Sequence, residues 1–282
     1  MKGRAAGPEG KPPPDLFPGD GMNRDSRERA ADTAVFCLGL LFLGALIQAA
    51  SWLKGDSLVF PGVAPILRAF FRLLGSGRTW RQIGVTLGHL ALALGISAAA
   101  GTLLGLLQGL SGTFYRFMRP LMGLLRSLPM IVLTVIVMVV TSYDRVPVAV
   151  TTLILVPMIS EAACEGCRRI EPELIDVYRM NSSLTPEVVR RVHLPLMAGY
   201  LRQAWVSAAG MGIRTTVTAE YLVQTRDSLG KAVFTSGYFF EYEEIYAYAL
   251  IMVLLVLGLG SLPRLLDRTG GDGTVQKGEK GI

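Results

Sequence analysis

Cysteine and histidine side chains are the first candidates for chemistry in this chain of 282 residues. Cys164 and Cys167 form a Cys-Glu-Gly-Cys motif, a spacing found in redox-active thiol pairs and in zinc sites. A structural zinc ion would need two further ligands, and His89 and His193 stand on separate segments without metal-ligand spacing. No Ser/His/Asp set or carboxylate pair accompanies them. We therefore interpret the cysteine spacing as coincidental and expect no metal site and no catalytic residues.

Arg214 and Glu220 are a second pair of candidates, because they interrupt an apolar segment at residues 196–223. A charged side chain that faces lipid near the centre of a transmembrane helix costs about 2.5–3.5 kcal/mol. Two interpretations avoid this cost. Either the side chains face a translocation pathway or a subunit interface, or they lie near the outer membrane boundary and reach water. We favour the first interpretation, in which Arg214 would attract an anionic substrate.

Composition places these residues in a membrane protein. Apolar residues make up 51% of the chain and charged residues 18%, and the mean hydropathy is +0.43. Crossing a bilayer takes about 20 apolar residues in a helix. Six segments provide such a length: residues 34–53, 82–115, 127–143, 146–163, 196–223 and 245–263. The sequence therefore predicts an all-α integral membrane protein with six transmembrane helices.

Basic residues predict the direction of these helices. If the N-terminus is cytoplasmic, residues 1–33, 111–126, 164–195 and 264–282 face the cytoplasm, and together they hold 18 of the 28 Lys and Arg residues. Cytoplasmic loops carry an excess of this kind, so we expect both termini in the cytoplasm. The first of these segments is rich in Pro, Gly and charge and is expected to be a disordered tail. The last is expected to be a second cytoplasmic tail.

Two segments are expected to form helix contacts. Gly101, Gly105 and Gly109 make two consecutive G-x-x-x-G steps, a pattern that lets another helix approach closely, within one subunit or between two. Residues 61–74 place apolar side chains at helical spacing and arginines on another face. This second pattern predicts a short helix that either lies on the outer membrane surface or packs as an ordinary loop helix.

The polar segment 164–195, between the fourth and fifth predicted spans, is longer than a simple turn requires. Its apolar residues recur at helical spacing, and Thr185, Pro186 and Glu187 form an N-cap and first turn for a second helix. We predict a helix–turn–helix-like element on the cytoplasmic face, with an exposed tip at residues 181–184. Docking to a soluble partner would require a structured element of this kind.

This segment resembles the cytoplasmic loop of ABC-importer permeases. The signature of that loop is Glu-Ala-Ala, three residues, Gly, nine residues, Ile, one residue and Leu-Pro. In this chain the register begins at Asp176, puts Ser182 at the glycine position, and ends at Val192, Leu194 and Pro195. The spacing is kept throughout, although several residue types differ. The resemblance implies that an ATPase subunit grips this loop.

The residues implied in this coupling are those of the tip and of the closing motif: Asp176, Val177, Tyr178, Arg179, Met180, Asn181, Ser182, Ser183, Leu184, Val192, Leu194 and Pro195. A literal Glu-Ala-Ala at residues 161–163 is not the motif, because it lies in the fourth predicted span and no Gly and Leu-Pro follow it at the right distance. Ser182 departs from the family at the centre of the docking turn, where glycine tolerates a left-handed backbone.

Three shorter motifs are similar to those of the permeases for nitrate, sulfonate, taurine and pyrimidine precursors: Arg126-Ser127-Leu128-Pro129 at the opening of the third span, Ala219-Glu220 in the fifth, and Ser228-Leu229-Gly230 after it. The chain departs from that branch at Ile213-Arg214, where the branch usually carries a tryptophan. This departure argues for an altered translocation path.

The resemblance implies a type I ABC-importer permease of the bacterial inner membrane, with a permease domain at residues 34–263. Its partners would be a second copy of the chain, two ATP-binding subunits and an extracytoplasmic solute-binding protein. The chain has no G-x-x-x-x-G-K-[ST] motif, so ATP hydrolysis is expected in a separate subunit. The cargo would be a small solute, with anionic and heterocyclic compounds as options. We expect no cofactor, no enzymatic activity and no nucleic-acid partner.

A permease from another branch of the family, for phosphate, molybdate or methionine, is the nearest alternative. The alternative from a different class is an ion-coupled secondary transporter or channel without an ATPase partner. Such a protein would carry acidic residues in several spans and would not need a long inner loop. Only the fifth predicted span, residues 196–223, is well charged. The charge pattern therefore favours the ATP-driven importer.

Overall fold

The computed structural model describes residues 61–169 and 189–270, together with Glu187 and six helical residues between positions 38 and 49. The chain divides into two units, Met1–Val63 and Ala64–Ile282. Most of the predicted first span, residues 34–53, lies outside the described residues. Both predicted tails also lie outside them, apart from the backbone up to Gly270. The secondary structure of the described part is helical throughout.

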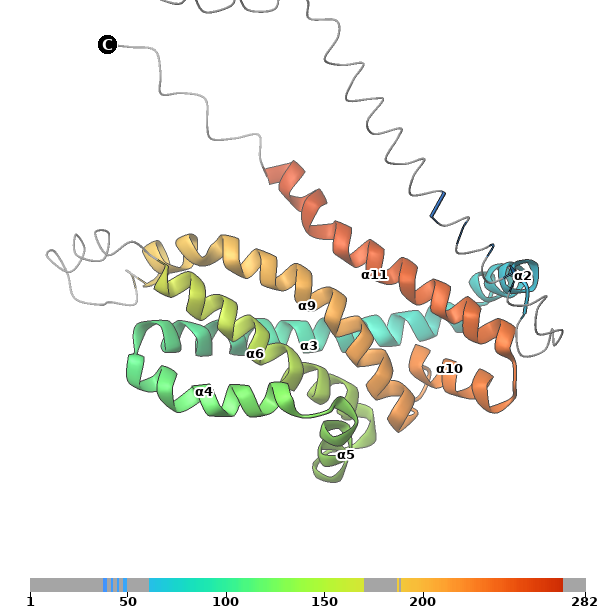
Figure 1. Cartoon of the computed structure of the whole chain (residues 1–282), viewed down its shortest axis with the longest axis horizontal. Coiled ribbons are helices and arrows are strands. Elements are labelled where there is room, and N and C mark those ends of the chain that lie inside the picture. Colours follow the sequence, from blue (N-terminus) through green and yellow to red (C-terminus); the bar gives the residue numbers. More distant parts are fainter. Residues whose placement is uncertain are drawn as a thin grey trace, which may run out of the picture. The chain divides into compact units, whose positions relative to one another are not determined.

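Three helices form the centre of the second unit. The helices α3 (Gly77–Leu110) and α6 (Val146–Arg168) share the most extensive contact, and α9 (Leu194–Val223) packs against both. Figure 1 shows α6 crossing between α3 and α9 along much of their length. The core beneath them contains fully buried Leu90, Leu155 and Ile213. This long packed layer holds the elements that carry the candidate sites.

The second predicted span lies within residues 82–115, a stretch longer than one span requires, and the helix that forms it ends before the stretch does. Helix α3 stops at Leu110, because Ser111 adopts an extended backbone and its side chain accepts a hydrogen bond of 3.3 Å from the backbone N–H of Phe114. Ser111 thereby becomes the N-cap of a new helix, α4 (Gly112–Ser127). In Figure 1, α4 runs back alongside the end of α3.

The third predicted span, residues 127–143, is not one straight helix. Most of its helical part is α5 (Met130–Val140), whose 11 residues are too few to cross a bilayer alone. Proline fixes its own backbone and disfavours a helical conformation in the residue before it, so Leu128 and Pro129 interrupt the chain. Helices α4 and α5 meet at 105°, as a broken span or a re-entrant pair.

The part of the chain that the structure describes has three helices long and apolar enough to cross a membrane, or four if the bent pair counts as one span. They are α3, the stretch Tyr143–Arg168 that contains α6, and α11 (Tyr242–Gly270) over Tyr242–Leu259. Helix α9, with Arg202, Arg214 and Glu220, is not among them. The number of six spans stays a prediction.

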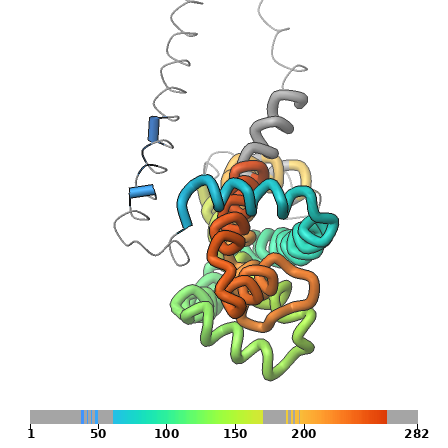
Figure 2. Tube along the Cα trace, turned by 90° about the vertical axis from the view of Figure 1, so that its right-hand side faces the viewer, coloured from blue at the N-terminus to red at the C-terminus, as the bar shows by residue number. Residues whose placement is uncertain are grey.

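Two short helices complete the second unit. Helix α2 (Val63–Leu74) occupies the predicted segment 61–74, buries Phe70 in the core, and crosses beside the start of α11 (Figures 1 and 2). An ion pair of 3.2 Å between Arg72 and Glu244 joins these two helices. Helix α10 (Leu229–Tyr238) lies between α9 and α11 and is absent from the sequence-based expectation.

Candidate functional site

Gly101, Gly105 and Gly109 lie where α3 packs on α6. A Cβ atom added at Gly105 would lie 2.5 Å from the Cβ of Ala163, and one added at Gly109 would lie 2.5 Å from the Cβ of Cys167. Both distances are far shorter than a carbon–carbon contact allows. The three glycines therefore permit two helix backbones to approach within one chain, the first of the two settings that their spacing suggested.

Glu220 is fully buried at the junction of three helices. Its Oε2 accepts hydrogen bonds from Thr86 Oγ1 at 2.8 Å and from the backbone N–H of Gly230 at 3.3 Å. Its Oε1 lies 2.8 Å from His89 Nδ1, within hydrogen-bond distance. Thr86 and His89 stand on α3, Glu220 on α9 and Gly230 on α10. The carboxylate therefore joins all three helices.

The same cluster satisfies the start of α10. A helix leaves its first N–H groups without partners inside the helix, and burial makes each unpaired group costly. Side chains satisfy three of them here: Thr86 Oγ1 accepts from Leu229, Glu220 Oε2 from Gly230 and Ser228 Oγ from Lys231. The side-chain oxygens of Glu220 thus lie at the positive end of the helix dipole. Two motifs noted separately in the sequence, residues 219–220 and 228–230, thus meet in one site.

Gly230 allows this close meeting. A Cβ atom added to it would lie 2.5 Å from the backbone N of Tyr221 and 2.5 Å from the carbonyl oxygen of Val217, both on α9. Backbone atoms cannot rotate out of the way as a side chain can. Glycine at this position therefore sets how closely α10 packs on α9.

Arg214 stands apart from this cluster. Its side chain is exposed on α9, and its backbone carbonyl accepts a hydrogen bond of 2.8 Å from Thr218 Oγ1. No ion pair between Arg214 and Glu220 occurs in the described residues. The two charges that the sequence analysis considered together therefore have different surroundings. A role in the pathway or at a subunit interface stays a prediction for both.

The predicted coupling loop is only partly described. Residues 176–184 lie outside the described residues, whereas Val192 belongs to a π-helical turn, Val189–His193, that leads directly into α9. Leu194 and Pro195 are exposed at the start of α9. At the predicted second helix of the loop, Glu187 forms an ion pair of 2.7 Å with Arg191.

His193 faces the end of α6 rather than solvent. It is buried, its Nδ1 lies 3.6 Å from Cys167 Sγ, and burial holds the pKa of His193 below the ordinary histidine value. Cys164 and Cys167 are both buried free thiols. Within residues 61–169 and 189–270, no group of three or more His, Cys, Asp or Glu side chains could hold a metal ion. Cys167 packs against Met197 at the start of α9.

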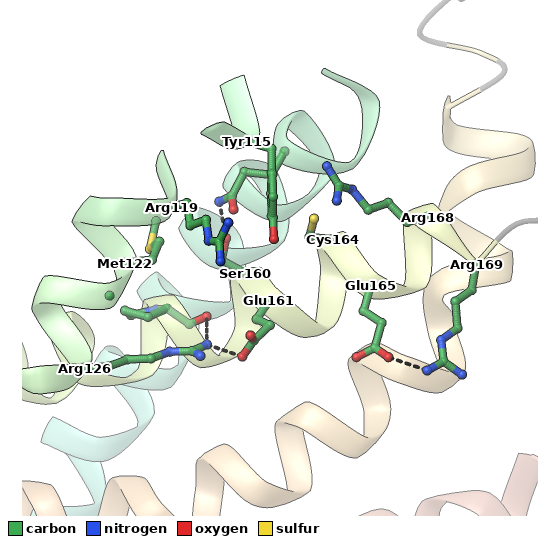
Figure 3. A pocket seen from close by; sticks show the side chains of 13 residues that line it. Tyr115, Arg119, Met122, Arg126, Ser160, Glu161, Cys164, Glu165, Arg168 and Arg169 are labelled. Carbon is green, nitrogen blue, oxygen red and sulfur yellow. Dashed lines mark hydrogen bonds and ion pairs between the residues drawn. The ribbon is translucent and has the colours of Figure 1, made fainter. Parts of the chain in front are cut away.

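Arg126, from the predicted Arg-Ser-Leu-Pro motif, joins α4 to α6. Its Nη2 donates a hydrogen bond of 2.9 Å to the carbonyl oxygen of Pro157 and forms an ion pair with Glu161. Glu161 is the first residue of the literal Glu-Ala-Ala that the sequence analysis set aside. Both contacts border a cavity, which is described below with Figure 3.

Sequence comparison identifies the family. Residues 99–269 match the family of the binding-protein-dependent transport system inner membrane component, which is more than half of the chain. The chain belongs to this family. This inner membrane component is thus an ABC-importer permease subunit that spans the membrane several times. No match is found among curated proteins.

Solved structures share the fold of this inner membrane component. A chain of the MetNI methionine ABC transporter, in inward-facing conformations from two crystal forms, aligns with a TM-score of 0.56 at 20% identity, covering 67% of this chain and 93% of that one. A chain of a bacterial ABC transporter involved in the import of the acidic polysaccharide alginate aligns with a TM-score of 0.61 at 15% identity, covering 89% and 99%. At these identities the likeness shows the fold, which is that of type I ABC-importer permeases.

Proposed function

We propose that this permease transmits the closure of a separate ATPase dimer to its membrane helices through the loop at residues 164–195. Together with a second copy of the chain, it would form the pathway for a small solute that an extracytoplasmic binding protein delivers. Family membership is the observation that carries this proposal. The spacing of the loop motif from Asp176 to Pro195, within the matched residues, also supports it.

The packing of α6 and α9 supports a mechanical role for the loop between them. Met197, at the start of α9, is fully buried against Ala163 and Cys167, near the end of α6. A Cβ atom added at Gly166 would lie 3.1 Å from Tyr200 Cδ2, so the two helices are in close contact there. A force on the loop would therefore move both helices together.

Contacts of α6 and α9 with α3 and α10 would transmit this movement to the rest of the unit. Helix α6 is bound to α3 through the glycine face, and α9 is bound to α3 and α10 through Glu220. Cores packed in this way tend to move as rigid bodies between discrete arrangements. The expected motion is a swing of these four helices against the second copy.

The orientation and the cargo are further parts of the proposal. The basic residues support cytoplasmic termini and a cytoplasmic loop. Arg214, an exposed cation on α9, supports an anionic solute. The binding protein would make the main selection among solutes.

Replacing Ser182 with tryptophan tests the coupling role. A bulky indole at the centre of the docking tip is expected to reduce co-purification of the ATPase subunit and to abolish transport, while the amount of permease in the membrane stays normal. The measurement is the ratio of ATPase to permease recovered on an affinity-tagged permease. Exposed Ser142, before the start of α6 and away from the loop, gives the matched control Ser142→Trp. Normal ATPase recovery and transport with Ser182→Trp would exclude the residue from coupling.

A further inference from the structure

A cavity of about 550 Å³ lies among the end of α3, α4 and the second half of α6 (Figure 3). It lies at the end of α6 from which the predicted coupling loop departs. Its charged lining consists of four arginines and two glutamates: Arg119, Arg126, Arg168, Arg169, Glu161 and Glu165. Positive charge is therefore in excess around an open space large enough for a small ligand.

Two of the four arginines are already neutralised by carboxylates. Arg126 pairs with Glu161, and Arg169 pairs with Glu165 at 2.7 Å on the next turn of α6. Figure 3 shows both pairs at the edge of the cavity. The excess positive charge of the lining therefore comes from the other two arginines, Arg119 and Arg168.

Arg119 and Arg168 hold that excess charge. The Cζ atom of Arg168 lies 3.8 Å from the centroid of the Tyr115 ring, and stacking of this kind leaves the N–H groups in the guanidinium plane free for an anion. In Figure 3, Arg119 and Arg168 approach from opposite sides of Tyr115. Arg119 makes no ion pair with any residue that the structure describes. We propose that this cavity binds a phosphate-bearing anion between Arg119 and Arg168.

The surface beside the cavity indicates where such an anion comes from. Phe117, Leu121 and Leu124 recur at spacings of three and four on α4 and are exposed at 70%, 47% and 57%. They form an apolar stripe on the same helix as Arg119. An anionic phospholipid would place its phosphate in the cavity and its acyl chains along this stripe. A soluble phosphate ester would use the same two arginines without the stripe.

The cavity lies near the predicted coupling loop, so an anion bound there would affect the helix that leads into the loop. In the proposed orientation the cavity faces the inner leaflet, which carries the anionic lipids that basic pockets between membrane helices bind. An anion there would bridge α4 and the end of α6, the helix that leads into the loop. The inference concerns this chain's own lipid or phosphate environment and does not depend on which solute is transported.

Lipid retention tests the inference. We would place the permease in nanodiscs of phosphatidylcholine with phosphatidylglycerol and count retained phosphatidylglycerol by native mass spectrometry, for the unmodified chain and for Arg119→Gln with Arg168→Gln. Loss of one charged hydrogen bond weakens binding by about tenfold or more, so loss of two is expected to weaken retention by about a hundredfold. Arg116→Gln is the matched control, because Arg116 lies on α4, bonds to the carbonyl of Gly112 at 3.3 Å and does not line the cavity.

A second arm separates the two sources of the anion. Inorganic phosphate is titrated into the detergent-purified protein by calorimetry. Phosphatidylglycerol retention that falls only in the double variant assigns the cavity to lipid, and phosphate binding that falls only in the double variant assigns it to a soluble phosphate. The single variant Arg119→Gln breaks no ion pair of the described residues, so it is measured alongside in case the double variant does not fold. Equal retention and equal phosphate binding in the double variant and in the Arg116→Gln control would overturn the inference.

Discussion

Replacing Gly105 with alanine is expected to destabilise the permease by about 3 kcal/mol, at the upper end of the cost of overpacking a core. The added methyl group would overlap the carbonyl oxygen of Ser160 and lie 2.5 Å from the Cβ of Ala163 and 3.0 Å from the backbone N of Cys164. None of these atoms belongs to a flexible side-chain end. Helices α3 and α6 would have to move apart along the contact that organises the whole unit. The measurement is the melting temperature of the detergent-purified protein.

Gly95 provides the matched control for this substitution. It lies on the same helix, α3, and a Cβ atom there would have nothing within 4 Å. Gly95→Ala is expected to be neutral or slightly stabilising, because alanine favours a helix by about 1 kcal/mol relative to glycine. Equal melting temperatures for the two variants would show that the glycine face does not set the distance between α3 and α6.

Removal of the Glu220 carboxylate is expected to release α10. Glu220→Ala would leave Thr86, His89 and the backbone N–H of Gly230 without their shared acceptor in a buried site. Each buried hydrogen-bonding group left without a partner costs about 1–3 kcal/mol. We expect hydrogen exchange to speed up first over Leu229–Tyr238, and the melting temperature of the whole protein to fall.

Two further variants make this experiment specific. Glu220→Gln keeps an oxygen for Thr86 and Gly230, and its amide can donate to His89 Nδ1 if the imidazole proton moves to Nε2. We therefore expect Gln to recover much of the lost protection of α10. Glu243, an exposed acid on α11, gives the control Glu243→Ala. Unchanged exchange over α10 in Glu220→Ala would refute the role of the carboxylate as the joint between α3, α9 and α10.

Helices that depend on local pattern could be predicted from the sequence. The apolar lengths of α3, α6 and α11 identify three membrane-crossing helices, and the periodic apolar residues of α2 place it correctly. Pro129 in the sequence marks the place where the helix breaks. The angle of 105° between α4 and α5 depends on packing that no local pattern encodes. Helix α10 was missed, although Ser228 as N-cap followed by Leu229 was a usable signal.

In the candidate site, too, some residues could be predicted from the sequence and others could not. Glu220 and Gly230 stood out in the sequence, one as a charge in an apolar segment and the other in a short motif. Their partners could not be found in that way, because Thr86 and His89 precede Glu220 by 134 and 131 positions and are ordinary residues in an apolar helix. The charged cavity was missed for the same reason, since Arg119 and Arg168 come from separate helices. Long-range contacts of this kind appear only in the folded chain.

The dependence of transport on a separate ATPase is tested most directly by uptake into proteoliposomes. The permease is reconstituted with and without the ATP-binding subunit, and the solute that co-purifies with the extracytoplasmic binding protein serves as the labelled cargo. Uptake is expected only when the permease, the ATPase and the loaded binding protein are all present with ATP, and vanadate is expected to abolish it. Accumulation of the solute by the permease alone, driven by an ion gradient and insensitive to vanadate, would contradict the ATP-driven importer and favour a secondary transporter.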